Sequence, residues 1–331
     1  MISSIKTDLV DALKGKRVWV AGHQGMVGSA LVRRLECENC TILTVSRSEL
    51  DLTQQADTKQ WIEDMRPEVV FVAAAKVGGI KANATYPVDF LYTNTMISMN
   101  IMKAAVDAGT QKFLLLGSSC IYPKLAAQPI EENALLTGPL EPTNEAYALA
   151  KISALKLAQA YARQHGIQSI SVMPTNLYGP NDNFDPENSH VIPAMLRRLH
   201  EAKMAGKEQV TLWGSGRPLR EFLHVDDLAD ACVFLMKSHD HIDLINIGSG
   251  QELSIRDLAH LISDVVGFRG RILFDPEKPD GAPRKLLNSS RLRELGWAPT
   301  VSLRRGLEDL YDRWQRDPQC AHETGWRQLM I

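Results

Sequence analysis

The stretch RVWVAGHQGMVGSALVRRLE, residues 17–36, contains an apolar run, a glycine-rich loop and a segment with helical spacing. Its three glycines lie between the predicted strand 17–22 and the predicted helix 29–36. Glycine permits a tight turn and lets backbone N–H groups approach a pyrophosphate at the helix N-terminus. The spacing GxxGxxG differs from the general GxGxxG fingerprint, but its position after a first strand predicts a dinucleotide site. The expected contacts are Gly22, Gly25, Met26, Val27 and Gly28.

The alternation of strand and helix continues along the chain. Strands are predicted at 41–45, 68–75, 112–117 and 168–174, and helices at 94–109 and 146–166. The strands are apolar along their length, which is typical of a parallel sheet covered by helices on both faces. The predicted fold class is therefore α/β, with a Rossmann-type doubly wound parallel sheet.

The alternation stops after Pro174. A loop-rich segment follows, and the later elements are predicted as a helix at 192–205 and strands at 209–214, 245–250, 271–275 and 284–288. Only the strand 245–250 is expected to rejoin the large sheet. The other elements after Pro174 are therefore predicted to form a smaller C-terminal α/β substrate-binding domain. The predicted boundaries are 14–180 plus 222–252 for the cofactor domain and 181–221 plus 253–317 for the substrate domain. A ligand crevice is expected at the carboxyl ends of the strands.

The end of the second strand bears on which dinucleotide binds. An acidic side chain there would bond the ribose hydroxyls of NAD, but the sequence TVSRSELDL places Arg47 near this point. A guanidinium suits the 2′-phosphate of NADP(H), which is the predicted cofactor. The alternative is that Arg47 is a solvated surface arginine. Asp51 and Leu52 are expected near the adenine.

The sequence GSSCIYP, residues 117–123, follows the apolar run 113–116 and places hydroxyls and a thiol at a strand end. If the strand continued through Cys120, Ser118 and Cys120 would lie on the same face. A free thiol has a pKa near ~8.5, and a nearby cation can tune it into a base at neutral pH. The alternative is that Cys120 is a small buried packing residue.

The sequence EAYALAK places Tyr147 and Lys151 four residues apart, on one face of a helix. A free tyrosine has a pKa near ~10, and a neighbouring ammonium lowers it, so the pair predicts an acid–base residue. The alternative is an ordinary contact on an amphipathic helix. The glycine loop and the polar strand end favour the catalytic interpretation.

These motifs, together with PTNLYGP, resemble the extended short-chain dehydrogenase/reductase family acting on nucleotide sugars. NSHVIPA, WGSGRPLREFLHVDD and KPDGAPRKLL narrow the resemblance to enzymes that act on a GDP-4-keto-6-deoxy sugar. The resemblance covers about Lys16 to Trp314. One departure is Gln24, where family members carry an arginine in the glycine loop.

The resemblance implies NADPH-dependent conversion of GDP-4-keto-6-deoxy-D-mannose to GDP-L-fucose, by 3,5-epimerisation and then reduction at C4. It assigns the carbon base to Cys120, the acid on the opposite ring face to His190, and the grip on the C4 oxygen to Ser118 and Tyr147, with Lys151 supporting Tyr147. The catalytic residues Ser118, Tyr147, Lys151 and His190 are also expected to contact the cofactor, as are Leu116, Gly117, Pro174, Asn176 and Leu177. The substrate domain should hold the GDP through Arg198, Trp213, Arg220, Asp280 and Lys285.

Two alternatives stay open at this point. A related enzyme that epimerises only C5, of the GDP-L-colitose type, would use the same cysteine and histidine. A non-catalytic NADP-sensing protein would keep the fold, but the presence of Ser118, Tyr147 and Lys151 argues against it.

The bulk composition excludes several classes of partner. The chain has 331 residues, 44% of them hydrophobic, and a net charge of −2, so neither nucleic acid nor an acidic membrane surface is an expected partner. The N-terminus lacks the apolar stretch of a signal peptide, and the longest apolar run, 69–75, is too short to span a membrane.

Five cysteines, an odd number, predict a reducing cytoplasm rather than a disulfide framework. Cys37 and Cys40 form a lone CxxC, interpreted as packing residues, and no metal site is expected.

Two of the predicted substrate residues have other interpretations. Trp213 could instead pack in the core, and Arg198 could instead lie on a solvated helix face. The family resemblance implies a homodimer, formed through the long helices near 94–109 and 147–165.

Overall fold

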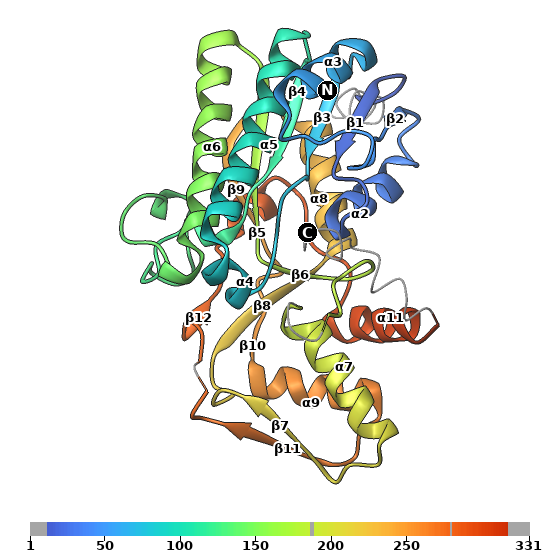
Figure 1. Ribbon diagram of the computed structural model, residues 1–331, viewed down its shortest axis with the longest axis vertical. Helices are drawn as coiled ribbons and strands as arrows, with labels where there is room; N and C mark the ends of the chain where they lie inside the picture. The colour runs from blue at the N-terminus through green and yellow to red at the C-terminus, as the bar shows by residue number, and fades with distance from the viewer. Residues whose placement is uncertain (1–11, 186–188, 279, 317–331) are drawn as a thin grey trace.

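The computed structural model describes residues 12–185, 189–278 and 280–316, and its centre is a six-stranded parallel sheet (Figure 1). The strand order places β2 (Thr41–Leu43) and β3 (Val69–Val72) on either side of β1 (Arg17–Ala21), followed by β4 (Lys112–Leu116), β5 (Gln168–Pro174) and β9 (Ile242–Ile247). The order reverses direction at β1, which is the switch point where such sheets bind ligands. The predicted Rossmann-type α/β fold is confirmed.

Helices cover both faces of this sheet (Figure 1). One face packs against α2 (Met26–Leu35) and α8 (Val225–Ser238), and the other against α3 (Gln55–Met65), α5 (Pro87–Asp107) and α6 (Glu145–His165). Alternate strand residues serve the two faces, since Val18 and Val20 lie in one core cluster and Trp19 and Ala21 in the other. Each large apolar side chain buried in this way contributes about 1.5–3 kcal/mol to folding.

A smaller α/β unit lies below the carboxyl ends of the sheet in Figure 1. It contains α7 (Val191–Met204), α9 (Ile255–Val266) and α11 (Leu303–Arg316), with a parallel pair of strands, β7 (Gln209–Trp213) and β11 (Arg271–Asp275). Leu196, Leu258 and Leu307, one from each helix, meet in its own hydrophobic core. This is the predicted smaller C-terminal domain.

A third, four-stranded sheet connects the two units. Its central strand, β8 (Leu219–His224), pairs with β6 (Asn176–Tyr178), β10 (Glu252–Ser254) and β12 (Arg284–Lys285). The proposed boundary at 221/222 falls inside β8, and the division at 180, 221 and 252 stays a prediction. Short helices α4 (Ile80–Thr85), α10 (Ser290–Glu294) and the 3₁₀ turns η2 (Glu132–Ala134) and η3 (Pro142–Asn144) complete the structure.

The expectation that β4 continues through Cys120 is wrong. The strand ends at Leu116, and Ser119–Ile121 form a 3₁₀ turn, η1, with Ser118 as its N-cap. The Ser118 hydroxyl accepts a hydrogen bond from the Cys120 N–H, at 3.3 Å, and this local bond ends the strand geometry. Ser118 and Cys120 are therefore neighbours through a turn, not through strand alternation.

Within the described ranges, no helix combines the length and the apolar character that crossing a membrane requires.

Candidate active site

The glycine loop packs so tightly that only glycine fits at two of its positions. Gly22 has φ +85°, and a Cβ there would lie 2.7 Å from Ala74 Cα. A Cβ on Gly28 would lie 2.0 Å from the carbonyl oxygen of Gly22. Gly25 is the N-cap of α2 and provides no side-chain cap, so the first N–H groups of the helix, including those of Met26 and Val27, are left for another acceptor. This arrangement fits a dinucleotide pyrophosphate.

The ends of β4 and β5 form the next part of the crevice. The N–H of Gly117 donates to the carbonyl of Val172 at 2.8 Å, and a Cβ on Gly117 would collide with the Met173 side chain. Pro174 ends β5, and Leu177 lies in β6. Asn176, also in β6, donates from Nδ2 to the Glu221 carbonyl at 2.9 Å. These residues therefore lie at the carboxyl ends of neighbouring strands, and their contact with the cofactor stays a prediction.

The residues predicted to contact the adenosine half lie after β2 and before α3. Arg47 is exposed, in a turn beyond the end of the strand. The Asp51 carboxylate accepts from the N–H and hydroxyl of Thr53, at 3.0 and 2.8 Å, and so stabilises its own turn. The carbonyl of Leu52 accepts from Asn100 Nδ2 at 3.0 Å. The preference for NADP(H) over NAD(H) stays a prediction from Arg47.

Tyr147 and Lys151 share one face of α6, as predicted. Lys151 Nζ lies 5.7 Å from the centre of the Tyr147 ring and donates to the Leu116 carbonyl at 2.8 Å. Burial lowers the pKa of Lys151 to about 8. Burial also raises the pKa of Tyr147, with the neighbouring Cys120 as a second cause. The expected lowering of the Tyr147 pKa by the ammonium is therefore wrong for this structure, because desolvation outweighs it.

Cys120 lies inside this cluster, with 7% of its surface exposed. Burial raises the pKa of its thiol, while Lys285, the hydrogen bond with Ser118 and Lys151 act in the opposite direction. The charge of Lys285, a predicted substrate residue, therefore acts electrostatically on the thiol of the predicted carbon base. Ser118, Cys120, Tyr147, Lys151 and Lys285 thus form one site.

His190 immediately precedes α7 and is its N-cap residue. The residue is exposed, and desolvation by the surrounding protein lowers the pKa of its imidazole. None of the contacts between described residues joins His190 to Cys120. Its role as the opposing acid stays a prediction.

Two of the predicted substrate residues meet across paired strands. Arg220 of β8 is in register with Lys285 of β12, and burial lowers the pKa of both cations. The Asp280 carboxylate accepts from the N–H and hydroxyl of Ser215, at 2.9 and 2.6 Å. A Cβ on Gly281 would lie 2.8 Å from Arg220 Nη2, so the segment at 280–281 packs directly over the guanidinium. Two partly desolvated cations side by side suit a diphosphate.

The remaining predicted substrate residues lie on the smaller unit. Trp213 is 68% exposed, which excludes the core-packing interpretation, and Lys278 Nζ lies 5.8 Å from the centre of its ring. Arg198 is exposed on α7 and donates to the Thr211 carbonyl at 3.2 Å. That bond ties α7 to β7, so Arg198 has a structural role in addition to its predicted one.

Sequence analysis missed several neighbours of the site. The Phe90 ring meets the Tyr147 ring edge-on, with 6.2 Å between centres. Lys76 forms an ion pair with Asp89 at 2.5 Å and lies 5.8 Å from the centre of the Phe90 ring. The motif AAAKVGG was a signal for Lys76, since it follows a strand, but nothing local indicated Phe90.

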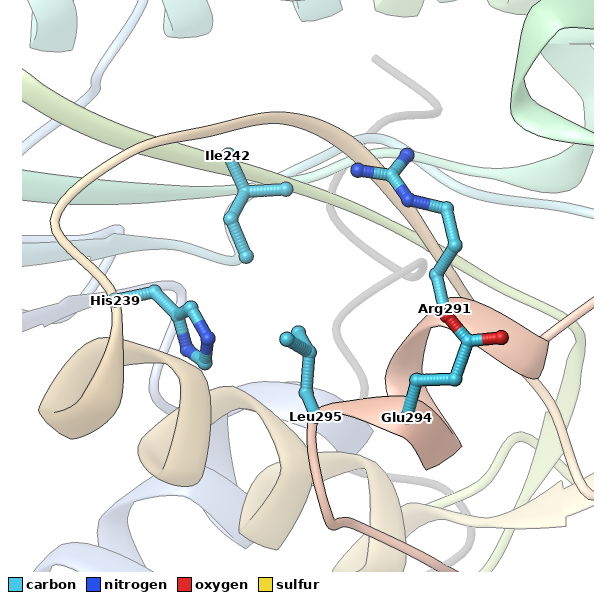
Figure 2. A pocket seen from close by; sticks show the side chains of 5 residues that line it. All are labelled: His239, Ile242, Arg291, Glu294 and Leu295. Atoms are coloured by element: carbon cyan, nitrogen blue, oxygen red, sulfur yellow. The ribbon is translucent and has the colours of Figure 1, made fainter.

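Figure 2 shows a pocket of about 260 Å³ lined by His239, Ile242, Arg291, Glu294 and Leu295. Ile242 is the first residue of β9, so this pocket lies at the amino end of the sheet. The catalytic cluster lies at the carboxyl end, and the pocket is therefore separate from it. Among the described residues, no group of three or more His, Cys, Asp or Glu side chains is placed to hold a metal ion.

Comparison with known proteins shows which families and solved structures this chain resembles. The profile of the NAD dependent epimerase/dehydratase family matches residues 18–248. GDP-L-fucose synthase 1 of Arabidopsis thaliana is 59% identical over 93% of this chain and 95% of its own. GDP-L-colitose synthase of Yersinia pseudotuberculosis is 37% identical, over 88% of this chain and 95% of its own. The solved structure of a GDP-L-fucose synthetase from Naegleria fowleri bound to NADP has a TM-score of 0.86 and 29% identity, covering 94% of this chain and 96% of that one. The chain therefore belongs to the NAD dependent epimerase/dehydratase family and, within it, to the group of GDP-L-fucose synthases.

Proposed function

We propose that this protein converts GDP-4-keto-6-deoxy-D-mannose to GDP-L-fucose, by epimerisation at C3 and C5 followed by NADPH-dependent reduction at C4. One observation carries the proposal. The Cys120 thiol and the Tyr147–Lys151 pair lie in a single buried cluster at the end of β4, with Lys285 beside the thiol. A carbon base and an oxygen proton donor in one site are what an epimerase that is also a reductase requires.

The epimerisation half rests on Cys120 and His190. Protons at C3 and C5 are acidic because both carbons are α to the C4 ketone. Cys120 removes such a proton as its thiolate, after the thiol has given up its own proton to solvent. The positive charges of Lys285 and Lys151 favour this thiolate and oppose the burial that raises the pKa of the thiol. His190 returns a proton to the opposite face. Desolvation lowers its pKa, which favours release of the proton that its imidazolium carries.

The reduction half rests on Ser118, Tyr147 and Lys151. When bound, NADPH supplies the hydride for C4. Ser118 donates a hydrogen bond to the C4 oxygen, and the Tyr147 hydroxyl gives that oxygen its proton. An alkoxide is a much stronger base than a phenolate, so Tyr147 can deliver its proton even with a raised pKa. Lys151, bonded to the Leu116 carbonyl, stays beside the ring and stabilises the phenolate that forms.

The cofactor and substrate contacts follow the same logic. NADP(H) is proposed because Arg47 is exposed in the turn that follows β2 and carries a guanidinium suited to a 2′-phosphate, and because the Naegleria fowleri relative is described as bound to NADP. Arg220 and Lys285 are proposed to hold the GDP diphosphate, with Trp213 stacking on the guanine. Residues 14–180 plus 222–252 would then form the NADP-binding domain, and 181–221 plus 253–317 the nucleotide-sugar-binding domain.

A C5-only epimerase of the GDP-L-colitose type is the less favoured alternative. The protein with that name is 37% identical to this chain, against 59% for the GDP-L-fucose synthase of Arabidopsis thaliana. A non-catalytic NADP sensor is not favoured either, because the site retains Ser118, Cys120, Tyr147 and Lys151 together.

Assembly and location are also proposals. Apolar side chains of α5 and α6 face solvent, among them Val88, Leu91, Tyr92 and Leu149. A second copy of the chain would cover them, which supports a homodimer through these helices. A cytoplasmic location is supported by the free cysteines Cys37, Cys40, Cys120 and Cys232.

The deciding experiment is incubation with GDP-4-keto-6-deoxy-D-mannose and NADPH, followed by identification of the product by NMR. The expected product is GDP-L-fucose, with solvent deuterium at C3 and C5 when the reaction runs in D₂O. Deuterium at C5 alone would support the alternative enzyme. No NADPH oxidation and no exchange would contradict both.

A further inference from the structure

A buried hydrogen bond holds the end of the turn that carries the proposed carbon base. The Tyr122 hydroxyl donates to Asn246 Oδ1 at 2.6 Å, and the two residues are 3% and 0% exposed. Tyr122 is the C-cap of η1, the 3₁₀ turn that carries Cys120. Asn246 lies in β9, paired with Met173 at the carboxyl end of the sheet. This bond therefore joins the turn that carries the thiol to a different strand of the sheet.

The orientation of the Asn246 amide is fixed by its other partners. Its Nδ2 donates to the carbonyls of Ile130 and Asn288, at 3.0 and 3.2 Å, and its backbone N–H donates to Glu132 Oε1 at 3.0 Å. With both carbonyls on the nitrogen side, the Oδ1 atom must face the Tyr122 hydroxyl. All the polar atoms of this side chain are thus satisfied, which is typical of a rigid buried network.

The same network holds the segment that carries Lys285. Asn288 lies three residues beyond Lys285, and its own N–H donates to the Ile130 carbonyl at 2.8 Å. The Glu221 carboxylate accepts from the N–H groups of Leu287 and Gly250, at 3.1 and 2.7 Å. The thiol and the cation that faces it are therefore anchored to a common buried frame.

The turn η1 needs such an anchor, because its own bonds are weak. Ile121 N–H to Ser118 carbonyl is 3.2 Å, and Tyr122 N–H to Ser119 carbonyl is 3.4 Å. Short 3₁₀ turns have poor hydrogen-bond geometry and little intrinsic stability. Tyr147 and Lys151, by contrast, lie on the long helix α6 and have no bond to Asn246 among the described contacts. Tyr147 and Lys151 of the reductive half are thus held by a different element from Cys120, whereas Ser118 shares the turn η1 with the thiol.

We propose that Asn246 is a positioning residue for epimerisation: through Tyr122 it holds the Cys120 thiol against the sugar carbon. This inference rests on the proposed function. A small displacement of the Cys120 sulfur from the sugar carbon slows proton abstraction strongly, because the reaction depends on near-attack geometry. Loss of the anchor should therefore slow epimerisation more than reduction, because Tyr147 and Lys151 remain in place on α6.

The test is Tyr122→Phe, which removes only the hydroxyl. Solvent deuterium uptake at C3 and C5 should fall by roughly tenfold or more. The fraction of product reduced without epimerisation should rise, and the Kd for NADPH should not change. The matched control is Tyr311→Phe, which removes another buried hydroxyl, bonded to His200 Nδ1 at 2.8 Å in the smaller unit. This control should leave the product ratio unchanged.

A second variant tests Asn246 itself. Asn246→Leu removes the acceptor of the Tyr122 hydroxyl together with the Nδ2 donor, so deuterium exchange should fall at least as far as in Tyr122→Phe. Exchange at the unmodified rate in Tyr122→Phe would overturn the inference and leave the proposed function standing. An equal fall in exchange and in hydride transfer would also overturn it, because that result would indicate a general structural role. Absence of exchange in the unmodified protein would overturn the proposed function, and this inference with it.

Discussion

At the scale of single residues, Cys120 shows two opposing effects on one thiol. Burial raises its pKa, and the positive charges of Lys285 and Lys151 lower it, together with the hydrogen bond to Ser118. Burial is the largest of these effects and favours the neutral thiol. The residue can act as a base only after it has lost its proton, and the charges of Lys285 and Lys151 favour that thiolate.

Replacement of this thiol gives the sharpest residue-level prediction. Cys120→Ser should abolish deuterium uptake at C3 and C5, because a serine hydroxyl is far less acidic than a thiol and cannot act as the same base. NADPH binding should persist, since the change is nearly isosteric. NMR of the sugar after incubation in D₂O measures the exchange. Uptake at the unmodified rate would mean that Cys120 is a packing residue.

Tyr147→Phe should have the converse effect. The hydroxyl is the proposed proton donor to the C4 oxygen, so NADPH oxidation should fall by about 10²-fold or more. Deuterium exchange should survive, because carbon deprotonation belongs to Cys120. Absorbance of NADPH and NMR of the sugar separate the two steps. Loss of exchange together with reduction would show that Tyr147 also polarises the ketone for epimerisation.

Arg47 determines the predicted choice of cofactor. Arg47→Ala should raise the KM for NADPH by roughly tenfold, which corresponds to the loss of one charge-assisted hydrogen bond, and should leave the KM for NADH nearly unchanged. Arg305→Ala, at an exposed arginine of α11, is the control. Steady-state kinetics with both cofactors measures the effect. Equal use of NADPH and NADH by the unmodified enzyme would contradict the prediction.

At the scale of elements, the C-terminal end of α8 depends on a lysine from the central sheet. Lys112 of β4 is buried, and its Nζ donates to the carbonyls of Met236 and His239. Burial lowers its pKa to about 8. The ammonium satisfies carbonyls that the helix end leaves unpaired, and it does so at the cost of burying a charge.

Lys112→Met should therefore destabilise the fold by a pH-dependent amount. An unfolded lysine keeps its proton to about pH 10.4, whereas the folded one loses it near 8, so between these values the unfolded state binds more protons. Stability from Lys112 therefore rises with pH in this window. Urea unfolding of both proteins at pH 7 and pH 9.5 should show a larger difference at pH 9.5. A difference independent of pH would contradict the lowered pKa of Lys112.

Local signals predicted most elements well and failed at particular points. Helix α6 ends at Gly166, whose φ of +70° is the left-handed cap that its glycine predicted. Helix α5 begins at Pro87, earlier than the predicted 94, because proline is favoured in the first helical turn and was not used as a start signal. Turn η1 was missed because the Ser118 side chain accepts a hydrogen bond from the N–H of Cys120, and this local bond ends the strand.

At the scale of the whole molecule, site residues that lie close together in the sequence could be predicted, and those brought together from distant segments could not. Ser118, Cys120, Tyr147 and Lys151 lie in two short motifs, and the strand–helix rhythm placed both at the same edge of the sheet. The approach of Lys285 to Cys120 depends on β12 returning to β8, and no local pattern reports such a return. The contact between Tyr122 and Asn246 was missed for the same reason.

The proposed dimer is a prediction at this scale. Val88 and Tyr92, which are 75% and 61% exposed on α5, should become buried between two copies of the chain. The double variant Val88→Glu/Tyr92→Glu should therefore sediment as a monomer, because buried, unpaired carboxylates are costly. Leu125→Glu, at a side chain 89% exposed on a loop, is the control and should remain dimeric. A monomeric unmodified protein would contradict the proposal.

The anchoring of η1 by β9 and by the segment at Asn288 also has a consequence for synthesis. A ribosome completes the glycine loop, Cys120 and the Tyr147–Lys151 pair long before it reaches Asn246 and Asn288. N-terminal parts of a chain fold first as they emerge. The residues proposed for reduction are therefore synthesised before Asn246 and Asn288, which anchor the turn that carries Cys120. Until Asn288 has left the exit tunnel, the turn that carries Cys120 lacks its anchor, and the epimerising half of the enzyme is the last to be built.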